Sequence, residues 1–130
     1  MNSIGKLQKD IHDSNAVAGW WTDLETGINL ANEARKGTRL GKAIVAEKLC
    51  LIHSEVSEAV EASRKNLMDD KLTHRKGVEV ELADAVIRIL DLAGALELDL
   101  DGAITEKLIF NLTRPDHKIA NRLKANGKAY

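Results

Sequence analysis

Two pairs of carboxylates, each spaced three residues apart, are the features of this sequence with the clearest chemical meaning. Glu55 and Glu58 form the first pair, and Glu81 and Asp84 form the second. Because residues i and i+3 project from one side of a helix, two antiparallel helices could aim all four carboxylates at one point. Like charges at short range repel one another and raise one another's pKa unless a hard cation lies between them. The spacing therefore predicts a site for Mg²⁺ or Mn²⁺.

Apolar residues recurring at about 100° per residue predict the first of the two helices that must carry these pairs, over residues 40–64. Its predicted core stripe consists of Val45, Leu49, Ile52, Val56, Ala59 and Val60. Glu55 and Glu58 fall on a strip with Leu51 and Ala62, so they border apolar surface rather than open water.

The second carboxylate helix is predicted over residues 78–96, and it is apolar nearly all round beyond its first turn. Such a helix is buried centrally or at a subunit interface. Its one polar stripe consists of Glu81, Asp84, Arg88 and Asp91. Because unpaired buried charges are unfavourable, an ion pair with Arg88 is the structural alternative to metal binding for Glu81 and Asp84.

Alanine, leucine, lysine and glutamate dominate the rest of the chain, and only one proline occurs, which predicts an all-α protein. We expect a helix over residues 3–18 and a short one over 30–35, within a glycine-punctuated stretch. A further helix should begin at an Asp101 N-cap and end near Thr113. Residues 116–130 are polar and basic, and we expect a flexible or partner-docked tail there.

Length and composition limit the classes of function. The 130 residues predict a single domain, and a formal charge of −1 provides no field that favours nucleic acid polymers or anionic membranes. One cysteine, Cys50, excludes an intrachain disulfide, and its helical surroundings predict a small packed side chain. Without a basic and apolar leader or a long apolar run, we expect a soluble protein of a reducing cytoplasm.

Two other metal chemistries fit poorly. A ferritin-like di-iron bundle requires Glu-x-x-His, and neither Glu55 nor Glu81 has a histidine three residues later. The stretch from Asp99 to Gly102 lacks the twelve-residue ligand spacing of a calcium loop, and helix capping explains it better. A non-catalytic helical interaction module with ion-paired carboxylates remains the alternative from a different class.

The two motifs resemble those of the MazG-like, all-α nucleoside triphosphate pyrophosphohydrolases. The resemblance covers most of the chain: E-x-x-E and E-x-x-D stand here as Glu55, Glu58, Glu81 and Asp84. A further element, Lys-x-x-x-Asn followed by Arg-Pro, stands as Lys107, Asn111, Arg114 and Pro115. The N-terminal Ile11-His12 with Gly19-Trp20-Trp21 is similar to small phage-type members, whereas the stretch between Trp21 and Arg39 is longer than in the shorter versions.

The resemblance implies an oligomeric bundle of four to five helices that converts a nucleoside triphosphate and water to a monophosphate and pyrophosphate. The four carboxylates would hold two or more Mg²⁺ or Mn²⁺ ions, and Glu58 is a candidate to take the proton from the attacking water. Lys107 and Asn111 are i,i+4 neighbours suited to phosphate oxygens, and Arg114 could contact phosphate or cap helical carbonyls. The relatives also imply a homodimer or homotetramer in the cytoplasm of a bacterium or a phage-infected host.

The base pocket is expected around the first helix. Trp20 and Trp21 are adjacent, so at most one should stack on a base while the other packs in the core or at an interface. The resemblance makes His12 and Asn15 candidates to recognise the edge of the base. A broad indole suits a purine, such as the guanine of dGTP.

Overall fold

The computed structural model describes residues 3–130, and this part of the chain is all-α, with 68% of residues in helices and no strand. In chain order the elements are α1 (Ile4–Val17), α2 (Leu30–Arg35), α3 (Arg39–Lys65), α4 (Gly77–Ala95), α5 (Leu100–Thr113), the 3-10 helix η1 (Pro115–His117) and α6 (Ile119–Arg122). The five helices predicted from the sequence are confirmed, but the N-cap of α5 is Asp99 rather than Asp101, because the Asp99 side chain accepts from the Gly102 amide. None of the helices described within residues 3–130 combines the length and apolar character that a bilayer crossing requires.

The chain divides into two compact units, the first ending at Leu98 and the second running from Asp99 to Tyr130. The assignment of residues 1–130 to a single MazG-like domain stays a prediction.

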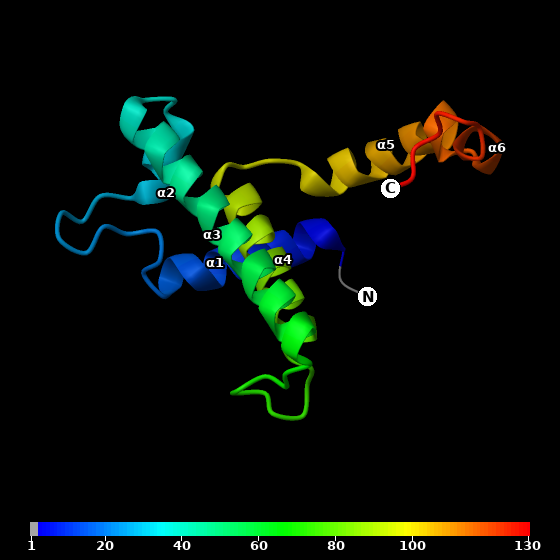
Figure 1. The fold of residues 1–130 in the computed structure, drawn as a ribbon. Coiled ribbons are helices and arrows are strands. Elements are labelled where there is room, and N and C mark those ends of the chain that lie inside the picture. Colours follow the sequence, from blue (N-terminus) through cyan, green and yellow to red (C-terminus); the bar gives the residue numbers. More distant parts are fainter. Residues whose placement is uncertain (1–2) are drawn as a thin grey trace. The chain divides into compact units, whose positions relative to one another are not determined.

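In the first unit, α3 and α4 lie side by side and run in opposite directions, joined by the loop of residues 66–76 (Figure 1). The helix α1 crosses this pair, and α2 packs against α3 near its beginning (Figure 1). A small core holds them together, centred on Trp21, Ala31, Ala34, Ile44, Leu92 and Ala95. Half of these residues are alanines, so the helices approach closely at those positions. The antiparallel pair is the arrangement that the carboxylate motifs require.

Two glycines of α4 allow this close packing. A Cβ on Gly94 would lie 2.6 Å from the Cβ of His12, so only glycine lets α1 approach α4 at this point. A Cβ on Gly77 would lie 3.0 Å from the Cβ of Ala62, where α4 begins beside the end of α3. The first contact brings side chains of α1 within reach of the polar stripe on α4.

The burial predicted for the carboxylate helices is partly wrong. Ala59 is buried as expected, but other members of the α3 stripe and part of α4 are between 40% and 54% exposed. The exposed residues are Leu49, Val56 and Val60 of α3 and Leu82, Val86 and Ile89 of α4. Helical spacing places both groups on a side of their helix turned away from the carboxylates. We call these six residues the apolar face; α4 is therefore buried on only part of its surface in the single chain. Cys50, also predicted to be packed, is exposed because it lies opposite Ala59 on α3.

The second unit contains the segment for which we expect a flexible or partner-docked tail, and this segment includes short helices. Residues after Thr113 form η1 and α6, which brings the number of α-helices within residues 3–130 to six rather than four or five. Local contacts fold this segment: the side-chain amide of Asn121 donates to the carbonyl of Pro115 at 2.7 Å, and Arg122 donates to the carbonyls of Lys128 and Ala129. Sequence periodicity missed α6 because a helix of one turn carries too little pattern.

Candidate metal centre and adjoining cavity

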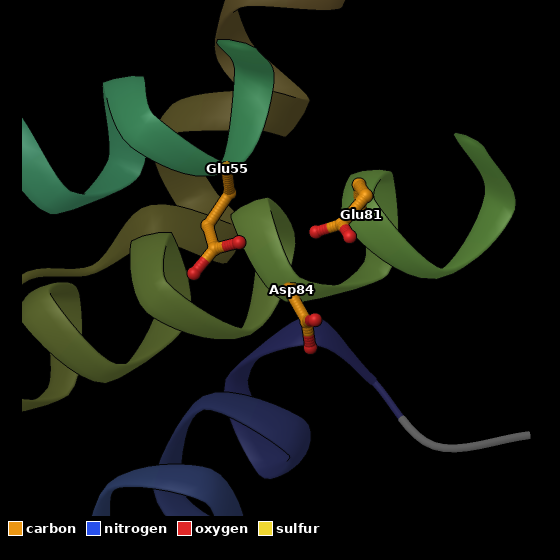
Figure 2. Close-up of side chains that lie close together, drawn as sticks. All are labelled: Glu55, Glu81 and Asp84. Carbon is orange, nitrogen blue, oxygen red and sulfur yellow. The ribbon is translucent and has the colours of Figure 1, made fainter. Parts of the chain in front are cut away.

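Three of the four predicted carboxylates converge. Glu55 comes from α3, and Glu81 and Asp84 come from successive turns of α4 (Figure 2). One oxygen from each side chain lies within 4.8 Å of an oxygen of the other two. Glu55 is buried, whereas Glu81 and Asp84 are partly buried. The i,i+3 spacing on α4 and the antiparallel packing of α3 together produce this cluster, which we call the acidic cluster.

The electrostatics of the acidic cluster favour a cation. Burial, followed by repulsion from Glu58, raises the pKa of Glu81 to about 7. Burial and the charge of Glu55 also raise the pKa of Asp84. Carboxylates whose ionised forms are disfavoured at neutral pH gain stability when a divalent ion lies between them. The donor set is oxygen only, which matches Mg²⁺ and Mn²⁺ better than ions that prefer nitrogen or sulfur ligands.

Glu55 is the exception, because it has a cationic partner. Arg88 donates from Nε to Oε1 of Glu55 at 2.6 Å. Burial is the largest single effect and acts to raise the pKa of Glu55, but the hydrogen bond and charge of Arg88, together with hydrogen bonds to Glu58 and Glu81, hold the pKa below its usual value. The predicted alternative paired Arg88 with Glu81 and Asp84, and neither of these forms an ion pair within residues 3–130. One carboxylate of the acidic cluster is therefore neutralised and two are not.

Glu58 lies at the edge of the acidic cluster. It does not belong to the group of three converging oxygens, and its side chain is exposed on α3. Its effect on the pKa of Glu81 shows that it is close to that carboxylate. Glu58 also lines a hollow of about 770 Å³ whose wall is strongly acidic. The carboxylates lining that hollow are Glu55, Glu58, Glu61, Asp69, Asp70, Glu81 and Asp84.

A cavity of about 550 Å³ begins at the acidic cluster and extends toward α1. Glu55, Asp84 and Arg88 line one part of it, and Asn15 and Trp20 also line it. Apolar side chains complete the wall, namely Leu30, Leu51, Ile87 and Leu92. Two of the four predicted metal residues, Glu55 and Asp84, and two of the predicted base residues, Asn15 and Trp20, therefore share one cavity. We call it the aromatic cavity.

The two adjacent tryptophans have separate environments, as the sequence predicts. Trp21 is 2% exposed and belongs to the core, whereas Trp20 is 68% exposed. The ammonium of Lys48 lies 4.4 Å from the centroid of the Trp21 ring and occupies one of its faces. Lys48 also donates to the carbonyl of Trp20 at 3.4 Å. Trp20 is therefore the indole with a large exposed surface, whereas Trp21 is a core residue that also lines the cavity.

A buried carboxylate that sequence reasoning did not assign lies beside the tryptophans. Asp91 is 8% exposed and accepts three hydrogen bonds of 2.8 Å, from His12 Nδ1, Asn15 Nδ2 and Trp21 Nε1. His12 also contacts the edge of the Trp21 ring, with centroids 5.5 Å apart. The sequence carried a signal for this residue, since Asp91 continues the polar stripe of Asp84 and Arg88 on an apolar helix. Lys48 had no such signal.

Of the predicted base-binding residues, the aromatic cavity brings together Trp20 and Asn15 but not His12. His12 does not line the cavity, and its Nδ1 bonds with Asp91 instead. The close approach of α1 and α4 at Gly94 directs the imidazole toward Asp91 rather than into the cavity.

The predicted phosphate-binding residues belong to the second unit. Lys107 and Asn111 stand on α5 at the predicted i,i+4 spacing, with the Lys107 ammonium 4.9 Å from the centroid of the Phe110 ring. The Oδ1 atom of Asn111 is buried without a hydrogen-bond partner among the described residues. Arg114 follows the helix and donates two hydrogen bonds, of 3.2 and 2.9 Å, to Asp116. Their role in phosphate binding stays a prediction.

We compared the chain with models of known protein families, with curated proteins and with solved structures, and none of the three comparisons returned a match. The acidic cluster and the aromatic cavity are therefore interpreted from their own chemistry.

Proposed function

We propose that this chain is a metal-dependent nucleoside triphosphate pyrophosphohydrolase. In the reaction, water attacks a (deoxy)nucleoside triphosphate and breaks one phosphoanhydride bond, giving a monophosphate and pyrophosphate. The observation that carries the proposal is the position of the acidic cluster at one part of a cavity that Trp20 and Asn15 also line. A site for cations beside a site for a flat aromatic ring matches the two ends of a nucleotide. Since such substrates are intracellular, the proposal places the protein in the cytoplasm.

In this proposal Glu55, Glu81 and Asp84 hold the ions. Bound Mg²⁺ or Mn²⁺ would neutralise the triphosphate and lower the pKa of a coordinated water. Arg88 keeps Glu55 ionised, and therefore ready to bind a cation, through the 2.6 Å hydrogen bond. Glu58, at the edge of the acidic cluster, is the candidate to accept the proton of the attacking water.

The aromatic cavity supports the substrate class. Its volume of about 550 Å³ lies within the roughly 300–1,000 Å³ of cavities that bind small molecules. The exposed indole of Trp20 offers a broad surface on which a base can stack, and the larger ring system of a purine gains more contact than a pyrimidine. We therefore favour a purine substrate such as dGTP.

The proposal is tested by pyrophosphate release from a panel of common and modified ribo- and deoxynucleoside triphosphates with Mg²⁺ or Mn²⁺. We expect release from at least one member, and its loss in Glu55→Gln. Glu79→Gln is the matched control, because Glu79 lies on the same helix as the cluster but is exposed and pairs with Arg75. Full activity in Glu55→Gln, or no release from any nucleotide, would contradict the proposal.

The ion pair between Arg88 and Glu55 favours a second candidate, a non-catalytic helical module in which this pair is structural. Such a module has no use for a divalent ion, so Mn²⁺ would leave its melting temperature unchanged. The enzyme should be stabilised by Mn²⁺ through linkage.

We also propose that the apolar face joins two copies of the chain. Six apolar side chains, each 40–54% exposed across α3 and α4, form the kind of surface that monomers rarely leave in water. Sedimentation should show a dimer or tetramer for the wild type and a smaller species for Val86→Glu. A monomeric wild type would contradict this assignment without affecting the metal site.

A further inference from the structure

The hydrogen bonds of Asp91 are divided unequally between its two oxygens. Oδ1 bonds with both Trp21 Nε1 and His12 Nδ1, and Oδ2 accepts from Asn15 Nδ2. An ionised carboxylate only accepts hydrogen bonds, and an indole N–H only donates them. The group that each neighbour turns toward Asp91 is therefore fixed.

This arrangement fixes the orientation of the Asn15 amide. Because one N–H of Nδ2 donates to Asp91, the amide is held in one orientation, and its carbonyl oxygen, Oδ1, is the acceptor left for other partners. Asn15 lines the aromatic cavity, and its Oδ1 has no partner within residues 3–130 and is not among the buried unpaired atoms of that range. The cavity thus contains a hydrogen-bond acceptor whose orientation is set by Asp91, a buried residue that also lines the cavity.

We propose that Asp91 is a positioning residue that sets the polarity with which the aromatic cavity recognises a base. In this view Asn15 Oδ1 accepts a hydrogen bond from an N–H group on the edge of the base, and Asp91 prevents the amide from turning over. The inference rests on the proposed function, since it assigns base recognition within the same site. It adds a means of discriminating between bases, which the acidic cluster does not provide.

Nucleobases provide a direct probe, because amino and keto bases present opposite polarities at the same positions. Adenine has an amino group beside an unprotonated ring nitrogen, and hypoxanthine has a carbonyl beside a ring N–H. Cytosine and uracil differ in the same way. A base of the wrong polarity would place an acceptor against Oδ1 and leave both groups unpaired, which predicts discrimination of about tenfold or more within each pair.

Asp91→Asn should reverse this preference. The new side chain must keep its carbonyl oxygen toward the N–H of Trp21, so its NH₂ group faces Asn15. The amide of Asn15 then has to turn over, accepting through Oδ1 and presenting Nδ2 to the cavity. Because Asn and Asp have nearly the same size, the cavity should keep its shape while Asn15 presents a hydrogen-bond donor instead of an acceptor.

The experiment compares kcat/KM for pyrophosphate release from dATP against dITP, and from dCTP against dUTP, in the wild type and Asp91→Asn. Calorimetry with the α,β-imido analogues of dATP and dITP and Mg²⁺ measures the same preference without turnover. We expect a preference of about tenfold or more in the wild type and the opposite preference in Asp91→Asn. A wild type without preference, or an Asp91→Asn protein that keeps or merely loses it, would overturn the inference.

Two further variants serve as controls for this experiment. Asn15→Ala removes the acceptor and should abolish the preference rather than reverse it, so a retained preference overturns the inference even if Asp91→Asn does not fold. Ser14→Ala, an exposed neighbour on α1, should leave the preference unchanged. Reversed binding of the analogues without pyrophosphate release would refute the proposed reaction and support the inference, whereas no binding of either analogue would refute both.

Discussion

The carboxylates at the two ends of the polar stripe on α4 differ in how their charge is compensated. Asp91 is buried and accepts three hydrogen bonds from α1 and from Trp21. Glu81 and Asp84 face two further carboxylates, and the one nearby guanidinium bonds with Glu55. The first end is electrostatically satisfied within the fold, and the second is not.

We infer from this difference that Asp91 positions its neighbours, whereas Glu81 and Asp84 bind a ligand. A buried carboxylate with a full set of donors gains little from a ligand, and it fixes its neighbours in place. Carboxylates that raise one another's pKa store an unfavourable interaction that a cation relieves. The pKa of Glu81, raised to about 7 by burial and by Glu58, marks the end where a ligand is expected.

The largest predicted effect is on activity at the acidic cluster. Asp84→Asn should lower pyrophosphate release by more than about 100-fold, because even partners outside the direct ligands of a metal are typically worth 10–100-fold. Steady-state kinetics with the best nucleotide of the panel checks this. An Asp84→Asn enzyme within tenfold of the wild type would place the catalytic metal elsewhere.

At the other end, Asp91→Ala should act on stability. Removing the carboxylate leaves the donors of His12, Asn15 and Trp21 unpaired, which should lower the free energy of unfolding by about 3 kcal/mol. Urea unfolding at saturating metal and without metal measures the loss. If Asp91→Ala instead removed the stabilisation by Mn²⁺ and left the metal-free protein as stable as before, Asp91 would belong to the metal site rather than to the structural end of the stripe.

Metal should stabilise the protein only through the acidic cluster. At a free Mn²⁺ concentration of 100 times Kd, linkage predicts a gain of about 2.7 kcal/mol. Thermal unfolding should show the gain in the wild type and in Asp91→Asn, but not in Glu81→Gln. Equal gains in all three proteins would indicate that the ions bind outside the acidic cluster.

Gly94→Ala should disturb the Asp91 end alone. The added Cβ would lie 2.6 Å from the Cβ of His12, and such overpacking typically costs about 1–3 kcal/mol. The indole N–H resonance of Trp21 should shift as its bond to Asp91 changes. An unchanged stability and spectrum would show that α1 and α4 are not in close contact there.

The smallest predicted effect is the pH dependence of metal-free stability. The pKa of Glu81 rises from 4.5 to about 7 on folding, so the folded state holds the proton more tightly than the unfolded chain. The associated stability is fully present below pH 4.5 and is lost as pH rises through about 7. Between pH 5 and 8, metal-free wild type should lose more melting temperature than Glu81→Gln. A parallel decline in both proteins would contradict the assigned pKa.

Much of the fold could be predicted from the sequence because its helices are long and strongly patterned. The predicted α3 and α4 differ from the observed bounds by one residue at each end. The short α2 was predicted over the residues it occupies, while α6, with only four residues, was missed. The exposure of Val56 and Val60 was also missed, because periodicity identifies an apolar stripe without identifying what covers it.

The candidate site could likewise be predicted only in part from the sequence. The i,i+3 spacing of Glu81 and Asp84 placed them together, and the antiparallel hairpin brought Glu55 to them. The role of Asp91 and the position of Lys48 against Trp21 depend on contacts between α1, α3 and the loop that follows α1. Spacing within one helix carries no information about such contacts.

By itself, the sequence determined which residues form helices and which carboxylates share a helix side, because both follow from local spacing along 3.6 residues per turn. Only the tertiary structure decided how those carboxylates differ. Arg88 reaches Glu55 rather than the acids on its own helix, and α1 supplies donors to Asp91 but, within residues 3–130, none to the acidic cluster. Charge and hydrogen bonding act through space over a few ångströms, so they are fixed only when the helices have packed.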